Sequence, residues 1–272
     1  MLGIFPISAF VICKNEARCI ERCLLSLDIC SEIVVVDSGS TDGTLEILER
    51  LAGQGLPIRL FHRDWPGYAA QKQFALEQCT QPWCLSIDAD EALDDEFRQA
   101  LPSLLASSDG IVGWRIPRRP YLIGHGFTPF HVHSPILRLI RRGEGRYDLA
   151  DKVHEGIRTK GRIAIARRGY LLHFRALPLD EQILKENTYS SLKADQLVER
   201  GRSRSVVRMA LSPPYYFLRL YFGHRLFMCG WPGFIEAMIG AVYSFMTEAK
   251  IYQRRVMREG VAREIKDVPA SE

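Results

Sequence analysis

The stretch Trp83-Cys84-Leu85-Ser86-Ile87-Asp88-Ala89-Asp90-Glu91 decides the fold, because an apolar run leads directly into two carboxylates one residue apart. The apolar run predicts a buried strand, and alternation along an extended backbone places Asp88 and Asp90 on the same side. Carboxylates at a strand end suit Mg²⁺ or Mn²⁺, which bind through carboxylates and substrate phosphates. The alternative is that these acids cap the helix expected from about Asp94.

Strands and helices alternate upstream of this stretch. Strands are expected at residues 7–13, 32–37 and 58–62, and helices after Asn15, at 44–52 and at 68–78. Four consecutive β-branched residues, Ile33 to Val36, are typical of a parallel strand buried on both faces. Asn15 is interpreted as the N-cap of the first helix. The alternation predicts an α/β fold with a doubly wound, mostly parallel sheet, in which ligands bind beyond the carboxyl ends of the strands.

Several short motifs resemble the inverting GT-A glycosyltransferases of family two. They are Phe10–Glu16, Val34–Thr44, Lys72 and Asp88–Glu91, in the family's order and spacing. The resemblance implies a Rossmann-like domain that binds a nucleotide sugar through Phe10, Ile12, Asn15, Glu16, Asp37, Ser38, Gly39, Asp42, Lys72, Asp88 and Ala89. A nucleotidyltransferase is the rival within this fold, but its Gly-rich, basic first loop is missing here.

The same resemblance implies particular roles. Asp37 accepts a hydrogen bond from the uracil edge, Lys72 approaches the diphosphate, and Asp90 holds Mg²⁺ or Mn²⁺. His173, after the apolar run Tyr170–Leu172, resembles a further metal ligand, although a core histidine bonded to backbone is the plain alternative. Asp88 is expected to face the ribose or a metal-bound water.

An inverting transfer needs a carboxylate that takes the proton from the acceptor hydroxyl. The candidates are Glu155 and Asp151 in Asp151-Lys152-Val153-His154-Glu155. The Val-His-Glu sequence resembles a motif of enzymes that modify the lipopolysaccharide core, and so Glu155 is preferred. An exposed, salt-bridging glutamate is the alternative.

Charge is distributed unevenly along the chain. Residues 1–114 contain 8 Lys and Arg against 17 Asp and Glu, whereas residues 115–175 contain 14 against 4. The basic middle predicts an anionic partner. Acceptor binding is assigned to Arg115, Arg138, Arg141, Arg142 and His154, with ordinary solvated charges as the alternative. No module for nucleic-acid binding is recognisable.

The last third of the chain has a different composition. A helix is expected from Leu179 to about Arg200, followed by aromatic and apolar runs flanked by basic residues, which suit a membrane interface. The run 231–246 falls short of the roughly twenty apolar residues that span a bilayer. Burial against the catalytic domain or in a dimer is the alternative.

The expected organisation is a GT-A catalytic domain at 1–178, a helical membrane-associating extension at 179–257 and a flexible tail at 258–272. The donor half is assigned to 1–109 and the acceptor half to 110–178. Seven cysteines without a C-x-x-C motif predict reduced core thiols, and the N-terminus shows no secretory signal.

The expected function is metal-dependent, inverting transfer of a hexose, glucose from UDP-glucose, to a lipid-linked acceptor. The resemblance is strongest to β-1,4-glucosyltransferases that extend the inner lipopolysaccharide core at heptose. Such an enzyme would be peripheral on the cytoplasmic face of a bacterial inner membrane, and a homo-oligomer is allowed. The alternatives are a transferase for capsule, another polysaccharide or a protein, and a non-catalytic nucleotide-sugar-binding membrane scaffold.

Overall fold

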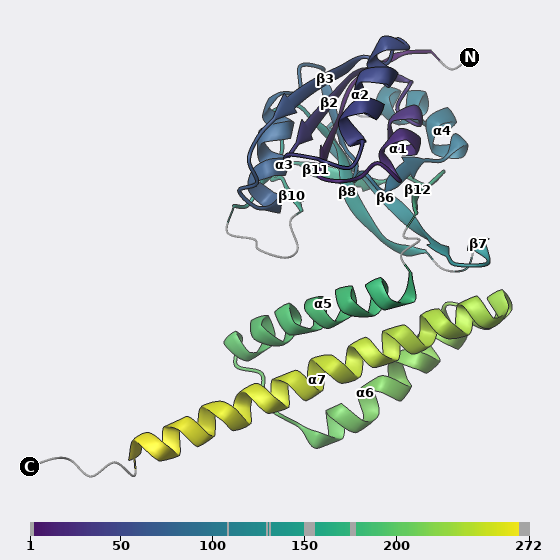
Figure 1. The fold of residues 1–272 in the computed structure, drawn as a ribbon. Helices are drawn as coiled ribbons and strands as arrows, with labels where there is room; N and C mark the ends of the chain where they lie inside the picture. Colours follow the sequence, from purple (N-terminus) through teal and green to yellow (C-terminus); the bar gives the residue numbers. More distant parts are fainter. Residues whose placement is uncertain are drawn as a thin grey trace, which may run out of the picture. The chain divides into compact units, whose positions relative to one another are not determined.

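The computed structural model describes residues 3–107, 109–128, 130, 132–149, 156–174 and 178–266. The chain divides into two compact units, Met1–Tyr121 with Val132–Arg175, and Leu122–His131 with Ala176–Glu272. Each unit has its own hydrophobic core. The first contains the residues that the sequence assigns to a donor site, and the second contains the long C-terminal helices (Figure 1).

The first unit begins with alternating strands and helices. They are β1 (Phe5–Cys13), α1 (Ile20–Leu25), β2 (Cys30–Asp37), α2 (Thr44–Gly53), β3 (Ile58–His62), α3 (Tyr68–Glu77) and β4 (Trp83–Ser86). Then follow β5 (Glu91–Leu93), α4 (Asp95–Ala106), β6 (Ile111–Leu122), β8 (His133–Arg141), β9 (Arg146–Tyr147), β10 (Ile157–Arg158), β11 (Arg162–Ile165) and β12 (Leu171–His173).

The main sheet has the order β3-β2-β1-β4-β8-β6-β12-β5, with β11 beside β6. β3, β2, β1 and β4 are parallel, as the alternation predicts. β8 joins β4 and β6 antiparallel, and β12 runs parallel to β6 but antiparallel to β5. The predicted mostly parallel α/β sheet is therefore confirmed, and its second half is mixed.

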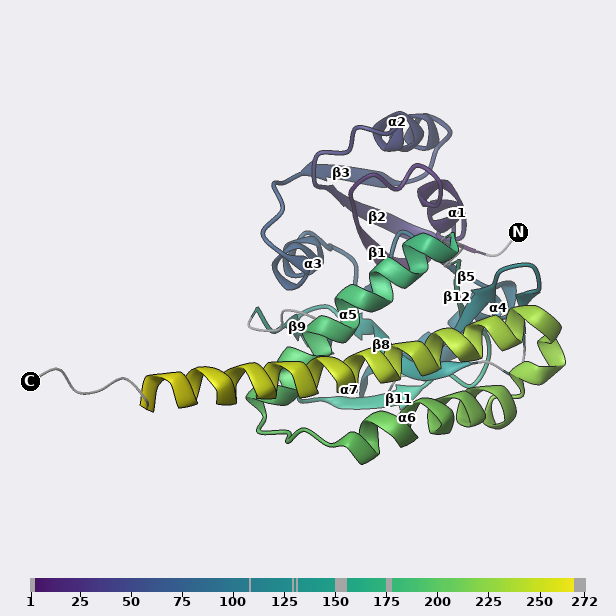
Figure 2. The same ribbon diagram turned by 60° about the horizontal axis from the view of Figure 1, so that its bottom comes forward.

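The two faces of the sheet are covered by different helices. Alternate strand residues such as Val35 pack with residues of α1, α2 and α4, and their neighbours, such as Val34, pack with residues of α3. The separation is visible in Figure 2, where α1 and α2 lie on one side of β1 to β3 and α3 on the other. Both faces of β2 are thus buried, which is why its β-branched run reads as continuously apolar.

Two sequence interpretations concern helix starts. Asn15 does not cap the first helix, which begins at Ile20 after Cys19 and has no side-chain cap. Instead Asn15 adopts a left-handed backbone with φ 58° and accepts a hydrogen bond from the backbone of Thr41. Asp94 does cap α4 by accepting from the Phe97 N–H, so Asp88 and Asp90 are left for another role.

The second unit is mainly helical. It contains β7 (Gly126–Phe127), α5 (Leu179–Glu199), α6 (Val206–Leu218), the π-helical turn η1 (Arg219–Gly223), the 3₁₀ turn η2 (Leu226–Cys229) and α7 (Gly230–Lys266). α5 and α6 both pack along α7 (Figures 1 and 2). α7 continues to Lys266, into the residues that the sequence analysis assigned to a tail from 258.

The C-terminal helices also show a longer apolar helical stretch than the sequence interpretation counted. The most apolar window of the stretch Leu226–Met257 has a mean hydropathy of 1.3, and the stretch is, by length and composition, sufficient to cross a membrane. The sequence interpretation counted only residues 231–246, whereas the helical structure extends on both sides of that run. All seven cysteines are free thiols, in agreement with the prediction.

Candidate functional site

Two loops that follow β1 and β2 are joined by backbone and side-chain hydrogen bonds. The Asn15 N–H donates to Ser40 Oγ at 2.9 Å, and the Thr41 N–H donates to Asn15 Oδ1 at 2.8 Å. The Glu16 N–H donates to Thr44 Oγ1 at 2.9 Å. Asp42 accepts from the Ala17 N–H at 3.1 Å and from Thr44 Oγ1 at 2.6 Å. Asn15, Glu16 and Asp42, all predicted site residues, thus fix one loop against the other.

A pocket of about 460 Å³ opens at these loops. It is lined by Ile12, Cys13, Lys14, Asn15, Glu16, Trp65 and Tyr68. Three of these residues, Ile12, Asn15 and Glu16, were predicted to bind the nucleotide. The aromatic wall of Trp65 and Tyr68, whose ring centroids are 4.7 Å apart, was missed because it comes from the β3–α3 segment, which carries no polar signal.

Asp37 lies at the end of β2 and is completely buried. Its Oδ2 accepts from the Gly39 and Ser40 N–H groups at 2.9 and 3.0 Å, and its Oδ1 accepts from Ser40 Oγ and Cys13 Sγ at 2.5 and 3.6 Å. Burial alone would raise the pKa of Asp37, but these hydrogen bonds hold it below its ordinary value. A carboxylate has about four lone-pair sites, so in this arrangement Asp37 shapes the loop rather than offering a free acceptor to uracil.

The neighbouring predicted residues support the same loop. The Ser38 N–H donates to the Cys13 carbonyl at 3.0 Å, and Ser38 Oγ accepts from Gln71 Nε2 at 2.9 Å. Gly39 has φ 81°, a conformation that glycine adopts without strain. Phe10 is buried in β1, with its ring edge-on to Tyr147. These residues therefore support the loops and the core next to the pocket and do not line it.

The two carboxylates of the Asp88–Asp90 turn face different partners. The turn replaces the extended backbone that the sequence interpretation assumed, so the predicted common side for Asp88 and Asp90 is wrong. Asp88 pairs with Lys72 Nζ at 2.9 Å and with both terminal nitrogens of Arg138, at 3.3 and 2.5 Å. Burial would raise the pKa of Asp88, but the two cations hold it well below its ordinary value. Ala89, between them, is buried.

Glu91 completes a buried charge network that the sequence interpretation missed. Its side chain accepts from Arg138 Nη2 at 2.9 Å, from Arg118 Nη1 at 3.5 Å and from the Asp88 N–H at 3.1 Å. Three cations, Lys72, Arg118 and Arg138, thus face two anions. The position of Glu91 directly after Asp90 was the available sequence signal. Its partners Arg118 and Arg138 lie on strands more than 25 residues away in sequence, so the network itself could not be predicted.

Asp90 and His173 lie together, as predicted. His173 Nε2 is 3.1 Å from Asp90 Oδ2, and the Phe174 N–H donates to the Asp90 carbonyl. The cause is the antiparallel pairing of β12 with β5, which places His173 opposite Glu91. The Asp90 carboxylate is 30% exposed, whereas the His173 side chain is 10% exposed.

This pair fits one side of a divalent cation site. A carboxylate oxygen and an imidazole nitrogen are both ligands for Mn²⁺, and the carboxylate also suits Mg²⁺. Within the described residues no cluster of three His, Cys, Asp or Glu side chains is present, and His173 Nδ1 has no hydrogen-bond partner there. Within the described part of the chain these two residues are the candidate ligands, and substrate phosphates would supply others.

The four arginines predicted to bind the acceptor do not form one cluster. Arg138 is buried against Asp88 and Glu91, so its guanidinium faces the interior. Arg141 pairs with Trp83 at the opposite end of β4 from Asp88 and stacks on the Trp83 ring. Arg142 is exposed in the next turn, and Arg115 is exposed on β6 beside the Pro135 carbonyl. These arginines thus lie in different surroundings, and their role in acceptor binding stays a prediction.

The base candidates Glu155 and Asp151, and the acceptor candidate His154, lie outside the described residues. Their roles remain predictions from the sequence.

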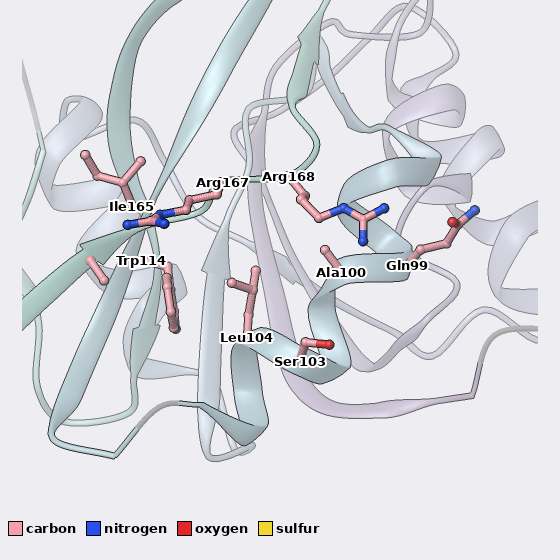
Figure 3. Close-up of a pocket in the computed structure, with 9 residues that line it drawn as sticks. Gln99, Ala100, Ser103, Leu104, Trp114, Ile165, Arg167 and Arg168 are labelled. Carbon is pink, nitrogen blue, oxygen red and sulfur yellow. The ribbon is translucent and has the colours of Figure 1, made fainter.

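A second pocket lies away from the acidic turn, between α4 and the strands β6 and β11 (Figure 3). It has a volume of about 710 Å³, and its lining includes Leu104, Trp114 and Arg168. None of the predicted site residues lines it. This larger pocket is therefore not the one that the nucleotide-binding motifs form.

Known proteins resemble the chain in sequence and in fold. A lipopolysaccharide core biosynthesis glycosyltransferase, LpsC, of Rhizobium meliloti is 59% identical over 95% of this chain and 96% of that protein. An uncharacterised glycosyltransferase of Rickettsia felis is 31% identical over 94% of this chain and 92% of its own length. The 1–349 fragment of S. aureus TarS, solved in complex with UDP-GlcNAc, has a TM-score of 0.50 at 15% identity and covers 92% of this chain and 91% of that fragment.

The structural likeness shows the GT-A fold alone, because the identity is low. The sequence matches carry more: the family described as Glycosyl transferase family 2 matches residues 8–152, which include both pocket loops, Lys72 and the Asp88–Asp90 turn. The scaffold and nucleotidyltransferase alternatives are thereby removed. The chain belongs to glycosyl transferase family 2 and is a glycosyltransferase.

Proposed function

We propose that this glycosyltransferase adds a hexose, glucose from UDP-glucose, to a sugar hydroxyl of the lipopolysaccharide inner core, with heptose as the acceptor. One observation carries the acceptor class: the 59% identity to the Rhizobium meliloti core biosynthesis enzyme extends over nearly the whole of both chains. The resemblance of the motifs to core glucosyltransferases supports the donor.

The donor is proposed to occupy the pocket at the two joined loops. Its walls include the apolar Ile12 and the rings of Trp65 and Tyr68, which suit a nucleoside, and its lining includes the carboxyl end of β1 and residues that follow β3. The hydrogen bonds through Asn15, Glu16 and Asp42 hold the loops in place before the ligand arrives. Such preorganisation lowers the entropic cost of binding.

Asp90 and His173 would hold a divalent cation, Mg²⁺ or Mn²⁺, together with the donor diphosphate. The cation would neutralise negative charge on the leaving diphosphate. Lys72 and Arg138 fix Asp88 by ion pairs, and this sets the direction of the turn from which Asp90 projects. Lys72 is buried and pairs with Asp88 beside this turn, and its approach to the diphosphate is part of the proposal.

The chemical step would be a single displacement with inversion. The acceptor oxygen bonds to the anomeric carbon while the bond from that carbon to the diphosphate oxygen breaks. Glu155, or else Asp151, would accept the proton of the acceptor hydroxyl. The acceptor is lipid-linked, so the enzyme would work at the cytoplasmic face of the inner membrane.

The proposal is tested by incubating the purified protein with core oligosaccharide and one donor at a time: UDP-glucose, UDP-galactose, UDP-GlcNAc or GDP-mannose. Each reaction contains Mg²⁺, Mn²⁺ or a chelator, and products are detected by mass spectrometry and their anomeric configuration by NMR. We expect metal-dependent addition of one hexose from UDP-glucose. A capsular fragment in place of the core tests the alternative acceptor. Transfer to the capsular fragment alone, or transfer that persists in chelator, would contradict the proposal.

A further inference from the structure

The exposed surface of α6 is mostly apolar, and the one charged side chain of this helix, Arg208, is 40% exposed and pairs with Glu248. The exposed positions of α6 are Val206, Val207, Ala210, Leu211, Pro214, Tyr215, Tyr216 and Leu218. The structure buries none of the residues of this helix. A helix that is apolar on most of its surface is normally found inside a protein core or in contact with lipid. α6 therefore presents an apolar surface that the second unit itself does not cover.

α7 continues this surface along one face. Between residues 231 and 251 the exposed positions are all large and apolar: Trp231 at 77%, Ile235 at 46%, Met238 at 42%, Val242 at 44% and Phe245 at 48%. Their spacing of three or four residues aligns them in one stripe. Ala237, Ala241 and Ile251 are buried in the unit instead. Only 28% of the most apolar window of this stretch is buried, which argues against an ordinary core helix.

α5 is an internal comparison, because it packs on the same α7. Its exposed positions mix apolar side chains, such as Leu184, with charged ones, such as Asp180, Asp195 and Glu199. This is the usual composition of a helix face in water. The mostly apolar surface is thus specific to α6 and the stripe of α7.

We propose that α6 and the Trp231–Phe245 stripe of α7 lie in the plane of a lipid bilayer, at the boundary between headgroups and acyl chains of one leaflet. This deepens the proposed function by naming the surface that meets the membrane, and it rests on that function only for the identity of the membrane. Exposed Arg219 and Arg225, next to Phe222 and Phe227, are placed to meet anionic headgroups.

The polar contacts of α7 favour this in-plane placement over a crossing. Lys250 Nζ donates to Asn187 Oδ1, Ser190 Oγ and Ser191 Oγ of α5, at 2.7 to 2.8 Å. Further contacts on the same helix pair Glu248 with Arg202, and Arg254 with Asp195. If α7 crossed the bilayer, these charges and the polar α5 would have to enter hydrocarbon or separate from each other. Ionised side chains inside the membrane are costly, so the helix keeps them on the water side.

The first test measures sedimentation of the full-length protein with vesicles of phosphatidylethanolamine and phosphatidylglycerol, without substrate. Phe245→Ser should weaken partitioning roughly tenfold, in keeping with the contribution of a large apolar side chain that leaves water. Leu25→Ser is the matched control, because Leu25 is similarly exposed, at 46%, but lies on α1 of the first unit. It should partition like the unchanged protein. UDP-glucose binding by both variants should match the unchanged protein, which separates this proposal from the catalytic one.

The second test locates Trp231 by fluorescence quenching with lipids brominated near the headgroup or near the chain end. The contribution of Trp231 is the difference from the Trp231→Phe variant. We expect stronger quenching by the bromine nearer the headgroup. Quenching that is stronger at the chain end would overturn the in-plane placement. Absence of binding to vesicles would overturn the proposal. If Phe245→Ser instead splits a lipid-free dimer in sedimentation velocity, the stripe is a contact between copies of the chain.

Discussion

Replacing Arg138 with Met separates a structural role for this arginine from the acceptor-binding role that the sequence suggested. Arg138 is 7% exposed, and its guanidinium contacts Asp88 and Glu91 at 2.5 and 2.9 Å. Methionine fills much of the volume but leaves the buried Glu91 carboxylate with Arg118, at 3.5 Å, as its cation partner among the described residues. Removing one partner of a buried ion pair typically costs about 3–5 kcal/mol, because the other charge stays desolvated. We expect Arg138→Met to lower the free energy of unfolding by that order.

The assay is equilibrium unfolding in urea, followed by the fluorescence of Trp83 and Trp114, which are buried in the same unit. Arg142→Met is the control, since Arg142 is exposed in the turn after β8, and its effect should stay within about 0.5 kcal/mol. Adding Glu91→Gln to Arg138→Met should cost less than the two single effects together, with a coupling of about 0.5–3 kcal/mol. Unchanged stability with a raised KM for the acceptor would refute this reasoning and restore the acceptor role.

Three further predictions concern other parts of the first unit. Asp90→Asn should abolish the Mn²⁺-dependent part of UDP binding in calorimetry, and undiminished metal-dependent affinity would remove Asp90 as a ligand. Glu155→Gln should leave UDP-glucose affinity near normal and lower kcat by about 10²–10⁴, while Asp151→Asn should remain active; the reverse pattern would move the base to Asp151. Hydrogen bonds to Glu32 outweigh the effect of its burial and hold its pKa below the ordinary value of 4.5. The ionised carboxylate therefore stabilises the fold above pH 4.5, and this stabilisation is lost as the pH falls through the lowered pKa. The unchanged protein should have a free energy of unfolding about 1–3 kcal/mol higher than Glu32→Gln, as expected for hydrogen bonds to a charged group. This difference should disappear at low pH, and a difference of equal size there would contradict the prediction.

Local patterns were sufficient to predict most of the α/β half. The run Ile33–Val36 identified β2 because a strand covered on both faces needs apolar residues at every position. β3 was predicted with its observed ends, and α5 to within one residue at its C-terminal end. These elements follow from periodicity and composition, which depend only on near neighbours in the chain.

Errors arose where a distant segment supplies the partner. Asn15 has the residue type of an N-cap, but its side chain instead accepts a hydrogen bond from the Thr41 N–H, 26 residues away. Arg138 resembles a solvated strand residue, and only the pairing of β8 with β4 shows that it faces Asp88. The adjacency of Asp90 and His173, 83 residues apart, was predicted only through the family resemblance. Sequence spacing cannot show which side chains a sheet brings together.

The division between Asp88 and Asp90 follows from the partners that each carboxylate has. Asp88 already forms ion pairs with Lys72 and Arg138. A metal cation that bound Asp88 would have to displace these side chains or share the Asp88 oxygens with them. Asp90 faces the His173 imidazole, and a carboxylate oxygen and a ring nitrogen this close together can bind the same metal. The network around Asp88 therefore fixes the turn, and Asp90 is the carboxylate that can respond to a ligand. On this reasoning, weakening the network should reduce metal-dependent donor binding through the position of Asp90, although Arg138 touches neither metal nor donor.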